Sequence, residues 1–179
     1  MQQSWRADHD KLTFIACLPL DDTPQEIVAG AQDSPDRMIG DVNLFLSAAD
    51  DDVEGCVGEL ELMIAHSSLR RRGYGRAALL VFLHYIATHS QDILDEYKRS
   101  QSVDKMSLRQ LNVKIGSQNE SSIRLFESIG FLQLGDGPNY FGEIEFALDG
   151  LISEGKTTGL LQKYGIQDYL ELPYIEAFR

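Results

Sequence analysis

The chain has 179 residues and a formal net charge of −12, which is enough length for one domain with a hydrophobic core. Its composition, 43% hydrophobic and 25% charged residues, is ordinary for a soluble globular protein. The acidity disfavours nucleic acid as the main partner, because a phosphate backbone requires a basic surface. It suits cationic substrates such as amines, although the charge can equally serve solubility alone.

The two cysteines and the N-terminal sequence indicate in which cellular compartment the protein is expected. Cys17 and Cys56 show no metal-ligand or redox spacing, which favours reduced thiols over a disulfide. The N-terminal sequence is polar and does not resemble a signal peptide. The longest apolar run, at residues 77–87, is too short to span a bilayer. We therefore expect a cytoplasmic protein with no membrane partner.

The first half of the chain predicts three strands in an antiparallel meander. The third strand places Glu59, Glu61 and Met63 on one face and larger apolar side chains on the other. A proline-rich loop follows the first strand, and an acidic turn at residues 48–55 separates the other two. The three strands are expected at residues 11–18, 38–47 and 56–65.

The second half predicts helices and strands together. A helix at residues 74–89 is apolar around most of its surface and is expected to pack on a sheet. The charged stretch 90–107 is expected to be an exposed excursion whose start can be helical. A helix at 119–131 begins at Asn119, a suitable cap, and stops at Gly130. The other elements are a strand at 108–116, a hairpin of strands at 131–135 and 140–148, and a weak helix and tail from 150. This order predicts an α/β layout with a mixed sheet.

An arginine- and glycine-rich segment lies between the third strand and the helix that follows. Such a segment makes an anion site, because the first turn of a helix presents unpaired N–H groups and the positive end of its dipole. Glycines let a ligand approach the backbone, and arginines add donors for phosphate oxygens. We interpret the segment as a diphosphate cradle, with a solvated basic loop as the alternative. Its residues are Arg70, Arg71, Arg72, Gly73, Tyr74, Gly75 and Arg76.

Gly73, Gly75 and Ala78 also fit the loose G-x-G-x-x-A dinucleotide pattern, with Asp92 downstream. That pattern follows the first strand of a parallel βαβ unit by a very short turn. Here the preceding strand closes an antiparallel meander, and seven residues separate Ala65 from Gly73. A nicotinamide-dinucleotide enzyme is therefore the less favoured alternative.

Two segments carry a family resemblance. Residues 70–75 resemble the R/Q-x-x-G-x-G/A signature of the GNAT acetyltransferases, which binds acetyl-coenzyme A (acetyl-CoA), between its usual strand and helix. The sequence NESSIRLFESIGF, residues 119–131, resembles the second signature of that family. The stretches IGDVNLFL, GELELMIA and VKIGSQNESSIRLFESIGF are most similar to the N-acetyltransferase 9-like branch. The resemblance implies a GNAT-like mixed, mostly antiparallel central sheet flanked by helices, with a splayed cofactor cleft.

The resemblance also implies a domain organisation. Residues 1–149 are expected to form one GNAT-like N-acetyltransferase domain, and residues 150–179 a C-terminal helix and tail. Members of the branch carry a further N-terminal segment, so the first strand and first helices are expected to be missing here. Their absence would expose a sheet edge. The stretch 90–107 is longer than is usual in the branch and is expected to be a peripheral insertion.

For the co-substrate, the resemblance implies acetyl-CoA between the third predicted strand and the strand at 108–116. Backbone groups near Ile64 and Ala65 are expected to pair with the pantetheine arm and to polarise the thioester carbonyl. The N–H groups from Arg71 to Arg76 are expected to hold the diphosphate. Asn119 resembles a position that contacts the pantetheine side, with a simple helix cap as an equal alternative.

Acetyl transfer to an amine requires a base, because the amine must lose a proton. Glu59 is the first candidate, since its spacing to Gly73 resembles that of the base glutamate in histone-acetylating relatives. Glu61 shares its face and is the second candidate. Two carboxylates on one face repel each other, which tends to raise the pKa of one and suits a base. The alternative is an ordinary polar, solvent-facing strand.

Phe126 departs from the family pattern. Many members carry a tyrosine at this position to protonate the leaving thiolate, which phenylalanine cannot do, and Phe126 is expected to pack in the core with Phe131. His66 is expected to be an exposed loop residue, with a proton acceptor as the alternative. No histidine or cysteine shows metal-ligand or triad spacing, so we expect no metal and direct transfer without an acetyl-enzyme.

The sequence therefore predicts an acetyl-CoA-dependent N-acetyltransferase that acts by direct attack of a primary amine. The acceptor is expected to be an amine-bearing protein or peptide, through its N-terminus or a lysine. The alternative is a weakly active or inactive CoA-binding or protein-interaction module, which Phe126 and the short N-terminus favour. No nucleic-acid partner is expected, and the oligomeric state stays open.

Overall fold

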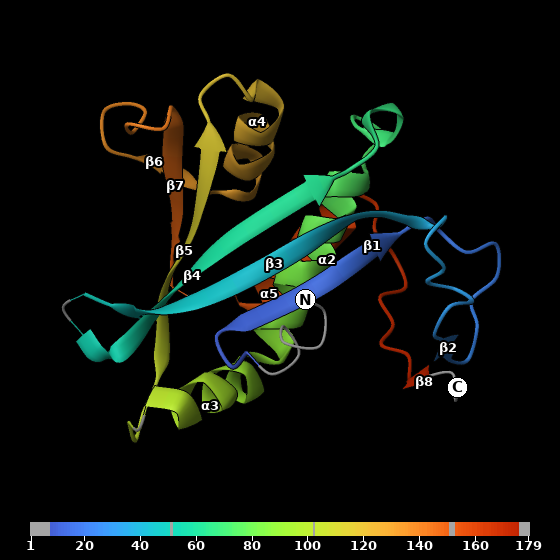
Figure 1. The fold of residues 1–179 in the computed structure, drawn as a ribbon, viewed down its shortest axis with the longest axis horizontal. Coiled ribbons are helices and arrows are strands. Elements are labelled where there is room, and N and C mark those ends of the chain that lie inside the picture. The colour runs from blue at the N-terminus through green and yellow to red at the C-terminus, as the bar shows by residue number, and fades with distance from the viewer. Residues whose placement is uncertain (1–7, 51, 102, 151–152, 176–179) are drawn as a thin grey trace.

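A six-stranded mixed sheet lies at the centre of the protein (Figure 1). The computed structural model describes residues 8–50, 52–101, 103–150 and 153–175. All neighbouring strands are antiparallel except the central pair, β4 and β5, which is parallel. This arrangement confirms the predicted mixed, mostly antiparallel sheet. In spatial order the strands are β1 (Lys11–Cys17), β3 (Met38–Ala49), β4 (Asp52–Ile64), β5 (Ser107–Gly116), β7 (Glu143–Asp149) and β6 (Leu132–Leu134).

The N-terminal strands form the predicted antiparallel meander, in which β3 pairs with both β1 and β4. The acidic turn expected at 48–55 is shorter in the structure, because β3 continues to Ala49 and β4 starts at Asp52. Arg109 Nε donates to Asp52 Oδ2 at 2.7 Å, which compensates a carboxylate at the start of β4. Acidic residues therefore do not prevent pairing at this exposed hairpin.

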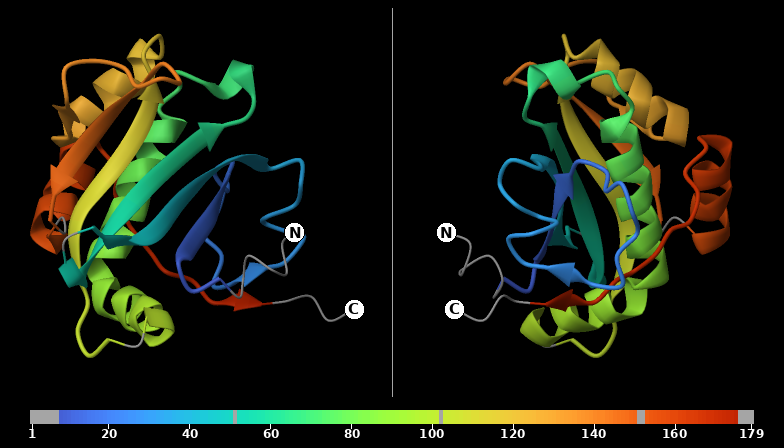
Figure 2. Two further views of the ribbon diagram at one scale, coloured as in Figure 1. Left: turned by 60° about the vertical axis from the view of Figure 1, so that its left-hand side comes forward. Right: turned by 90° about the vertical axis from the view of Figure 1, so that its right-hand side faces the viewer.

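Helices cover one face of the sheet (Figure 2). α2 lies against the strands, α5 packs on α2, and α4 lies on the same side. Their apolar positions meet the inward-facing strand residues, and burial of this apolar surface is the main stabilising contribution. The helices are α2 (Tyr74–Thr88), α3 (Ser90–Gln101), α4 (Glu120–Ile129) and α5 (Glu154–Lys163). Side chains at most 1% exposed in this core include Leu44, Leu60, Leu79, Leu83, Leu111 and Phe146.

The opposite face of the sheet carries polar side chains, and none of the helices in the described ranges covers its centre (Figure 2). The predicted alternation along the third strand is confirmed, because Leu60 is buried whereas Glu61 is exposed. On the neighbouring strand, Asn43 Nδ2 donates to Asp41 Oδ2 at 2.6 Å, and Thr13 Oγ1 donates to Asn43 Oδ1 at 2.7 Å. This polar face meets the candidate site described below.

The charged stretch 90–107 begins with a helix, as predicted for its start, but this helix is partly buried rather than a wholly exposed excursion. α3 buries Tyr97, which is 3% exposed, and packs Ile93 and Leu94 against the core. These side chains lie on one face of the helix, because residues three and four positions apart are neighbours. The high charge of the surrounding residues hid this narrow apolar stripe from the sequence analysis.

The predicted C-terminal hairpin is present, but its second strand starts at Glu143 rather than at residue 140. Asn139 Oδ1 accepts the N–H groups of Phe141 at 2.9 Å and Glu143 at 3.0 Å, which makes a local turn. Tyr140 and Phe141 therefore lie outside the sheet and are 97% and 80% exposed.

The segment from α5 (Glu154–Lys163) to Ile175 passes the C-terminal half of α2 and reaches the N-terminal half of the protein (Figure 1). Thr157 of α5 is buried, and its Oγ1 lies 2.8 Å from Nδ1 of His84 on α2. Further on, β8 (Tyr174–Ile175) pairs in parallel with β2 (Ile27–Val28), which lies in the predicted proline-rich loop. The division of the chain at residue 149 stays a prediction.

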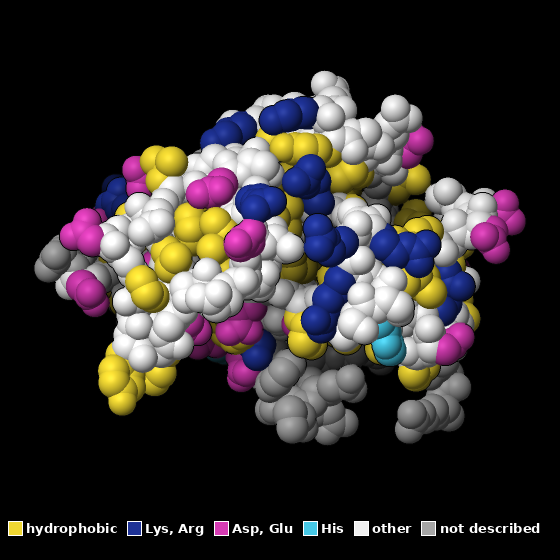
Figure 3. Space-filling view, turned by 90° about the horizontal axis from the view of Figure 1, so that it is seen from above, with side chains coloured by type: hydrophobic (Ala, Val, Ile, Leu, Met, Phe, Trp, Pro, Cys, Tyr) yellow, Lys and Arg dark blue, Asp and Glu magenta, His cyan; other side chains and the backbone are white. Residues whose placement is uncertain are grey.

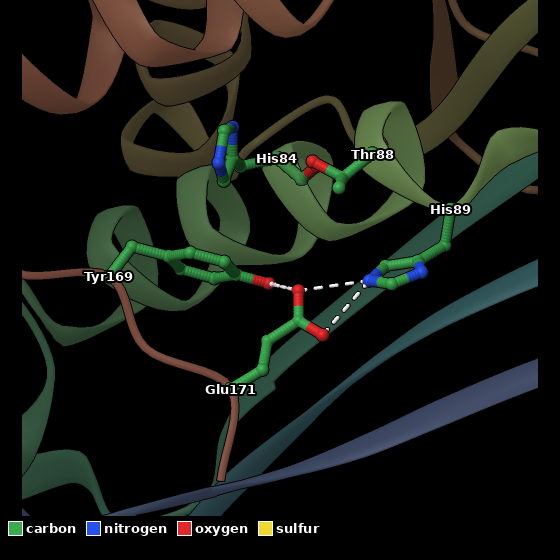
Figure 4. A network of polar contacts seen from close by, with 5 residues as sticks. All are labelled: His84, Thr88, His89, Tyr169 and Glu171. Atoms are coloured by element: carbon green, nitrogen blue, oxygen red, sulfur yellow. Dashed lines mark hydrogen bonds and ion pairs between the residues drawn. The ribbon is translucent and has the colours of Figure 1, made fainter.

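A polar network fastens this segment to the C-terminal end of α2 (Figure 4). Glu171 lies 2.9 Å from His89 Nε2, and Tyr169 Oη donates to Glu171 at 2.6 Å. The Tyr169 hydrogen bond and the His89 contact lower the pKa of Glu171. The Tyr169 ring also packs edge-on against His84, with 4.7 Å between ring centroids.

Candidate active-site cleft

A cleft opens in the sheet where β4 and β5 separate. Their parallel pairing ends at Glu59 and Asn112. Beyond this point β4 stays paired with β3 and β5 with β7, so each arm keeps its outer partner while the two diverge. The resulting cleft has a volume of about 400 Å³ and walls from β3, β4, β5, α4 and β7. This confirms the predicted splay.

The start of α2 lies beside this cleft and is not capped by the protein. Gly73 precedes the helix without a side-chain cap, and no hydrogen bond among the described residues uses a backbone N–H of residues 71–76. None of these residues lines the cleft itself. A Cβ placed on Gly75 would lie 3.7 Å from Leu62, which does line it. The helix start therefore offers unpaired N–H groups next to the cleft wall.

The loop before α2 has two residues in the left-handed region. Gly73 has φ of 92° and Arg71 has φ of 60°. A Cβ on Gly73 would meet nothing within 4 Å, so backbone conformation rather than space favours glycine there. Left-handed backbone at a non-glycine residue is strained and is concentrated at functional loops.

The loop and the end of β4 hold each other. Arg70 donates from Nε to the carbonyl oxygen of Ile64 at 2.8 Å and from Nη2 to that of Ala65 at 3.2 Å. Its guanidinium therefore braces the loop. The N–H of Ala65 donates to the carbonyl of Ile39 at 2.8 Å, so this N–H is already used within the sheet. Contacts of Ile64 and Ala65 with a pantetheine arm stay predictions.

The other arginines of the loop lie in different settings. Arg71 and Arg72 are exposed, whereas Arg76 lies over the Tyr164 ring at 4.3 Å from its centroid. Figure 3 looks onto this end of the molecule and shows basic side chains gathered around hydrophobic ones. A protein with a net charge of −12 thus presents a local positive surface at the start of α2, where guanidinium groups suit phosphate oxygens.

The start of α4, across the cleft, is capped. Asn119 Oδ1 accepts the N–H of Ser122 at 3.2 Å, and both residues line the cleft. The structure thus forms the predicted helix cap at Asn119, whereas its contact with a pantetheine stays a prediction. Phe126 is 2% exposed, and its ring packs edge-on against Phe131 at 5.1 Å between centroids, as expected for a core residue.

Both candidate base residues line the cleft. Glu59 Oε2 accepts a hydrogen bond from Lys114 Nζ of β5 at 2.7 Å, and this bond raises the pKa of Lys114. Glu61 lies further along β4 and is exposed, and no ion pair with it is found in the described ranges. The structure therefore brings both carboxylates to the cleft and compensates Glu59 with a cation.

Sequence reasoning missed three charged residues that line the same cleft, Lys114, Asp41 and Glu143. The alternation of side chains along residues 108–116 places Lys114 on a polar face of the strand, and the sequence alone could have predicted this. It could not show that this face adjoins Glu59, because the order of strands in the sheet is a tertiary property.

The remaining predicted features concern histidine, cysteine and metal. His66 is exposed before a short 3₁₀ turn, η1 (Ser67–Leu69). Cys17 and Cys56 are free thiols, and burial raises the pKa of Cys56 to about 11, which makes it a poor nucleophile.

In the part of the chain that the structure describes, no group of three acidic, histidine or cysteine side chains could hold a metal ion. None of the described helices is both long and apolar enough to cross a membrane.

A parallel pair that splays within a mixed sheet, with an uncapped helix after its first strand, is the arrangement that the resemblance to GNAT acetyltransferases implies. The family model described as "Acetyltransferase (GNAT) domain" matches residues 2–132. The chain belongs to this family.

Its curated relatives are N-acetyltransferases, which confirms the resemblance to the N-acetyltransferase 9-like branch. The N-acetyltransferase 9-like protein of Schizosaccharomyces pombe is 36% identical over 172 residues, covering 83% of this chain and 74% of the relative. Alpha/beta-tubulin-N-acetyltransferase 9 of Mus musculus is 35% identical over 177 residues, covering 97% of this chain. The chain spans 61% of the length of this mouse relative.

Solved structures agree on the fold. A spermidine N-acetyltransferase SpeG K23-Y30 chimera from Vibrio cholerae and hSSAT superposes with a TM-score of 0.52. The two are 15% identical, and the match covers 87% of this chain and 75% of the other. At this identity the likeness concerns the fold alone.

Proposed function

We propose that the protein is an acetyl-CoA-dependent N-acetyltransferase that acts on a primary amine of a protein, at an N-terminus or a lysine. The observation that carries the proposal is the uncapped start of α2 beside the cleft between β4 and β5. Its free N–H groups and the exposed Arg71 and Arg72 suit a pyrophosphate. The mouse relative is named for tubulin, which supports a protein acceptor.

Each predicted site residue has a role in this proposal. Residues 71–76 bind the diphosphate, and Arg70 positions that loop against the end of β4. Ile64 and Ala65 approach the thioester, and Asn119 borders the pantetheine side. In the same proposal residues 1–149 form the catalytic domain, residues 150–179 follow it as a helix and tail, and the protein works in the cytoplasm.

The reaction is direct attack of the amine nitrogen on the thioester carbonyl. A nitrogen–carbon bond forms, the carbon–sulfur bond breaks and coenzyme A leaves as the thiolate. The proton of the amine passes to Glu59 or Glu61, the carboxylates of β4 that line the cleft. Phe126 has no proton to donate, so water carries the proton from the carboxylate to the thiolate, which regenerates the base.

Peptide acetylation followed by mass spectrometry tests the proposal. Peptides with free N-termini and internal lysines are incubated with acetyl-CoA and either wild type or Glu59→Gln. The variant keeps the shape of the side chain and removes the base, so we expect turnover to fall by about a hundredfold. Acetyl-CoA binding, measured by calorimetry, should stay unchanged. Wild-type protein that neither binds acetyl-CoA nor acetylates any peptide would overturn the proposal.

The second candidate is a CoA-binding module without turnover. Phe126 favours it, because a buried phenyl ring stands where many family members carry a proton-donating tyrosine. The same experiment separates the candidates, since a module binds acetyl-CoA and acetylates no peptide.

A further inference from the structure

A lysine side chain bridges the two arms of the sheet inside the cleft. Lys114 of β5 and Glu59 of β4 both line it, with 2.7 Å between Nζ and Oε2. Glu59 holds the last paired position, so this ion pair lies where the strands part. The side chains of Lys114 and Glu59 are 41% and 36% exposed, so a ligand can reach both charged groups.

Carboxylates surround the Lys114 ammonium group. The hydrogen bond with Glu59, together with the charges of Glu145 and Glu143, raises the pKa of Lys114. Asp41 lines the same cleft from β3. The cleft therefore already contains one primary ammonium group, that of Lys114, paired with the Glu59 carboxylate. The acceptor of the proposed reaction carries a second primary ammonium group.

We propose that Lys114 is an internal competitor of the acceptor, and that its ammonium group occupies the place on Glu59 that the acceptor's ammonium group takes. The proposal rests on the proposed function, because it concerns the acceptor side of that site. Displacement is easy, since a half-exposed ion pair contributes little stability.

Two properties of the acceptor follow from this competition. The acceptor must carry a charged amine, because a blocked or neutral group cannot replace Lys114 on a carboxylate. The residues beside that amine should not be acidic, because Asp41 and Glu143 would repel them across the cleft. The favoured class is a cationic amine in a neutral or basic segment.

The test measures peptide binding to the full chain in the absence of acetyl-CoA. Binding is monitored through the NMR chemical shifts of the protein's backbone amides. The probe is tetra-alanine amide with a free N-terminus, and its N-acetylated form is the control. Lys114→Met removes the competing charge at similar length, whereas Lys114→Arg keeps it. We expect Lys114→Met to bind the free peptide about two- to fivefold more tightly than wild type, because exposed ion pairs are weak. Lys114→Arg should match wild type, and the acetylated peptide should show no gain.

Equal or weaker binding of the free peptide by Lys114→Met overturns the proposal, and so does a lack of binding by both proteins. Weaker binding would show that Lys114 positions Glu59 rather than competing for it. A parallel titration with acetyl-CoA keeps the two proposals apart. If acetyl-CoA binds and Lys114→Met brings no gain, only the competitor proposal fails. If acetyl-CoA does not bind, the proposed function fails.

Discussion

The helices α2 and α4 begin at the same end of the sheet and start in opposite ways (Figure 1). At α4, Asn119 accepts a backbone N–H of the first turn, and Glu120 adds a negative charge there. At α2, Gly73 provides no side-chain cap, and the first turn has no acidic residue. The start of α4 thus has a side-chain cap and an acidic residue, whereas the start of α2 has neither and keeps its N–H groups and positive dipole end for a ligand.

Packing explains why α2 tolerates an uncapped start. A cap is worth about 1 kcal/mol, which is a large share for a short helix with little burial. α4 has ten residues and buries only Phe126 and Ile129, so it depends on its cap. α2 has fifteen residues and buries six of them, so the core holds it in place. The comparison shows that a helix anchored by its core can keep its start available for binding.

The largest expected effect comes from giving α2 the acidic first turn that α4 has. Gly75→Glu places a carboxylate at the second helical position, where a Cβ finds ordinary contacts at 3.7 Å. The helix dipole favours this charge, so folding should be unimpaired, but the charge repels a pyrophosphate. We expect acetyl-CoA affinity, measured by calorimetry, to fall at least about thirtyfold, given the strength of charge-assisted phosphate contacts.

Two controls accompany this variant. Gly75→Gln has the same size without the charge and should lose far less affinity. Ser121→Glu places the same charge at the matching position of α4, on an exposed residue, and should bind acetyl-CoA as wild type does. Equal losses in Gly75→Glu and Ser121→Glu would show that the two helix starts do not differ in ligand binding.

An intermediate effect is expected from the arginines. Arg72→Gln removes an exposed cation beside the start of α2, and we expect acetyl-CoA affinity to fall about three- to tenfold, with a weaker dependence on salt. Arg124→Gln is the matched control on α4, where the guanidinium pairs with Glu120 at 2.6 Å. If both variants lose affinity alike, general attraction rather than a local cradle binds the anion.

The smallest effect on binding is expected at α4. Asn119→Ala removes its cap and should lower the free energy of unfolding by about 1 kcal/mol in urea titrations. Asn119→Ser keeps a capping oxygen and should restore most of that stability. Acetyl-CoA affinity should change less than twofold in both, because the Asn119 side chain already caps α4 and borders the pantetheine without a polar contact to it. A stable Asn119→Ser protein with weak binding would instead assign Asn119 a contact with the pantetheine.

Local sequence rules predicted the elements that carry their own signals. Asn119 and Gly130 mark the two ends of α4, and Gly130 has φ of 112° as a helix stop requires. The alternation along β4 predicted which face carries Glu59 and Glu61. At α3 the rules allowed a helix but missed the narrow apolar stripe that buries Tyr97. They failed at Tyr140, where a turn centred on Asn139 replaces the strand.

The sequence by itself therefore determined the strands and helices with clear periodicity, the basic loop before α2 and the resemblance to GNAT acetyltransferases. Only the tertiary structure decided that Lys114 forms an ion pair with Glu59 and that Arg70 donates a hydrogen bond to the end of β4. It also decided that His89 meets Glu171, 82 residues away along the chain. The physical reason is that periodicity and capping act within a few residues, whereas strand order and the docking of distant segments depend on packing of the whole core.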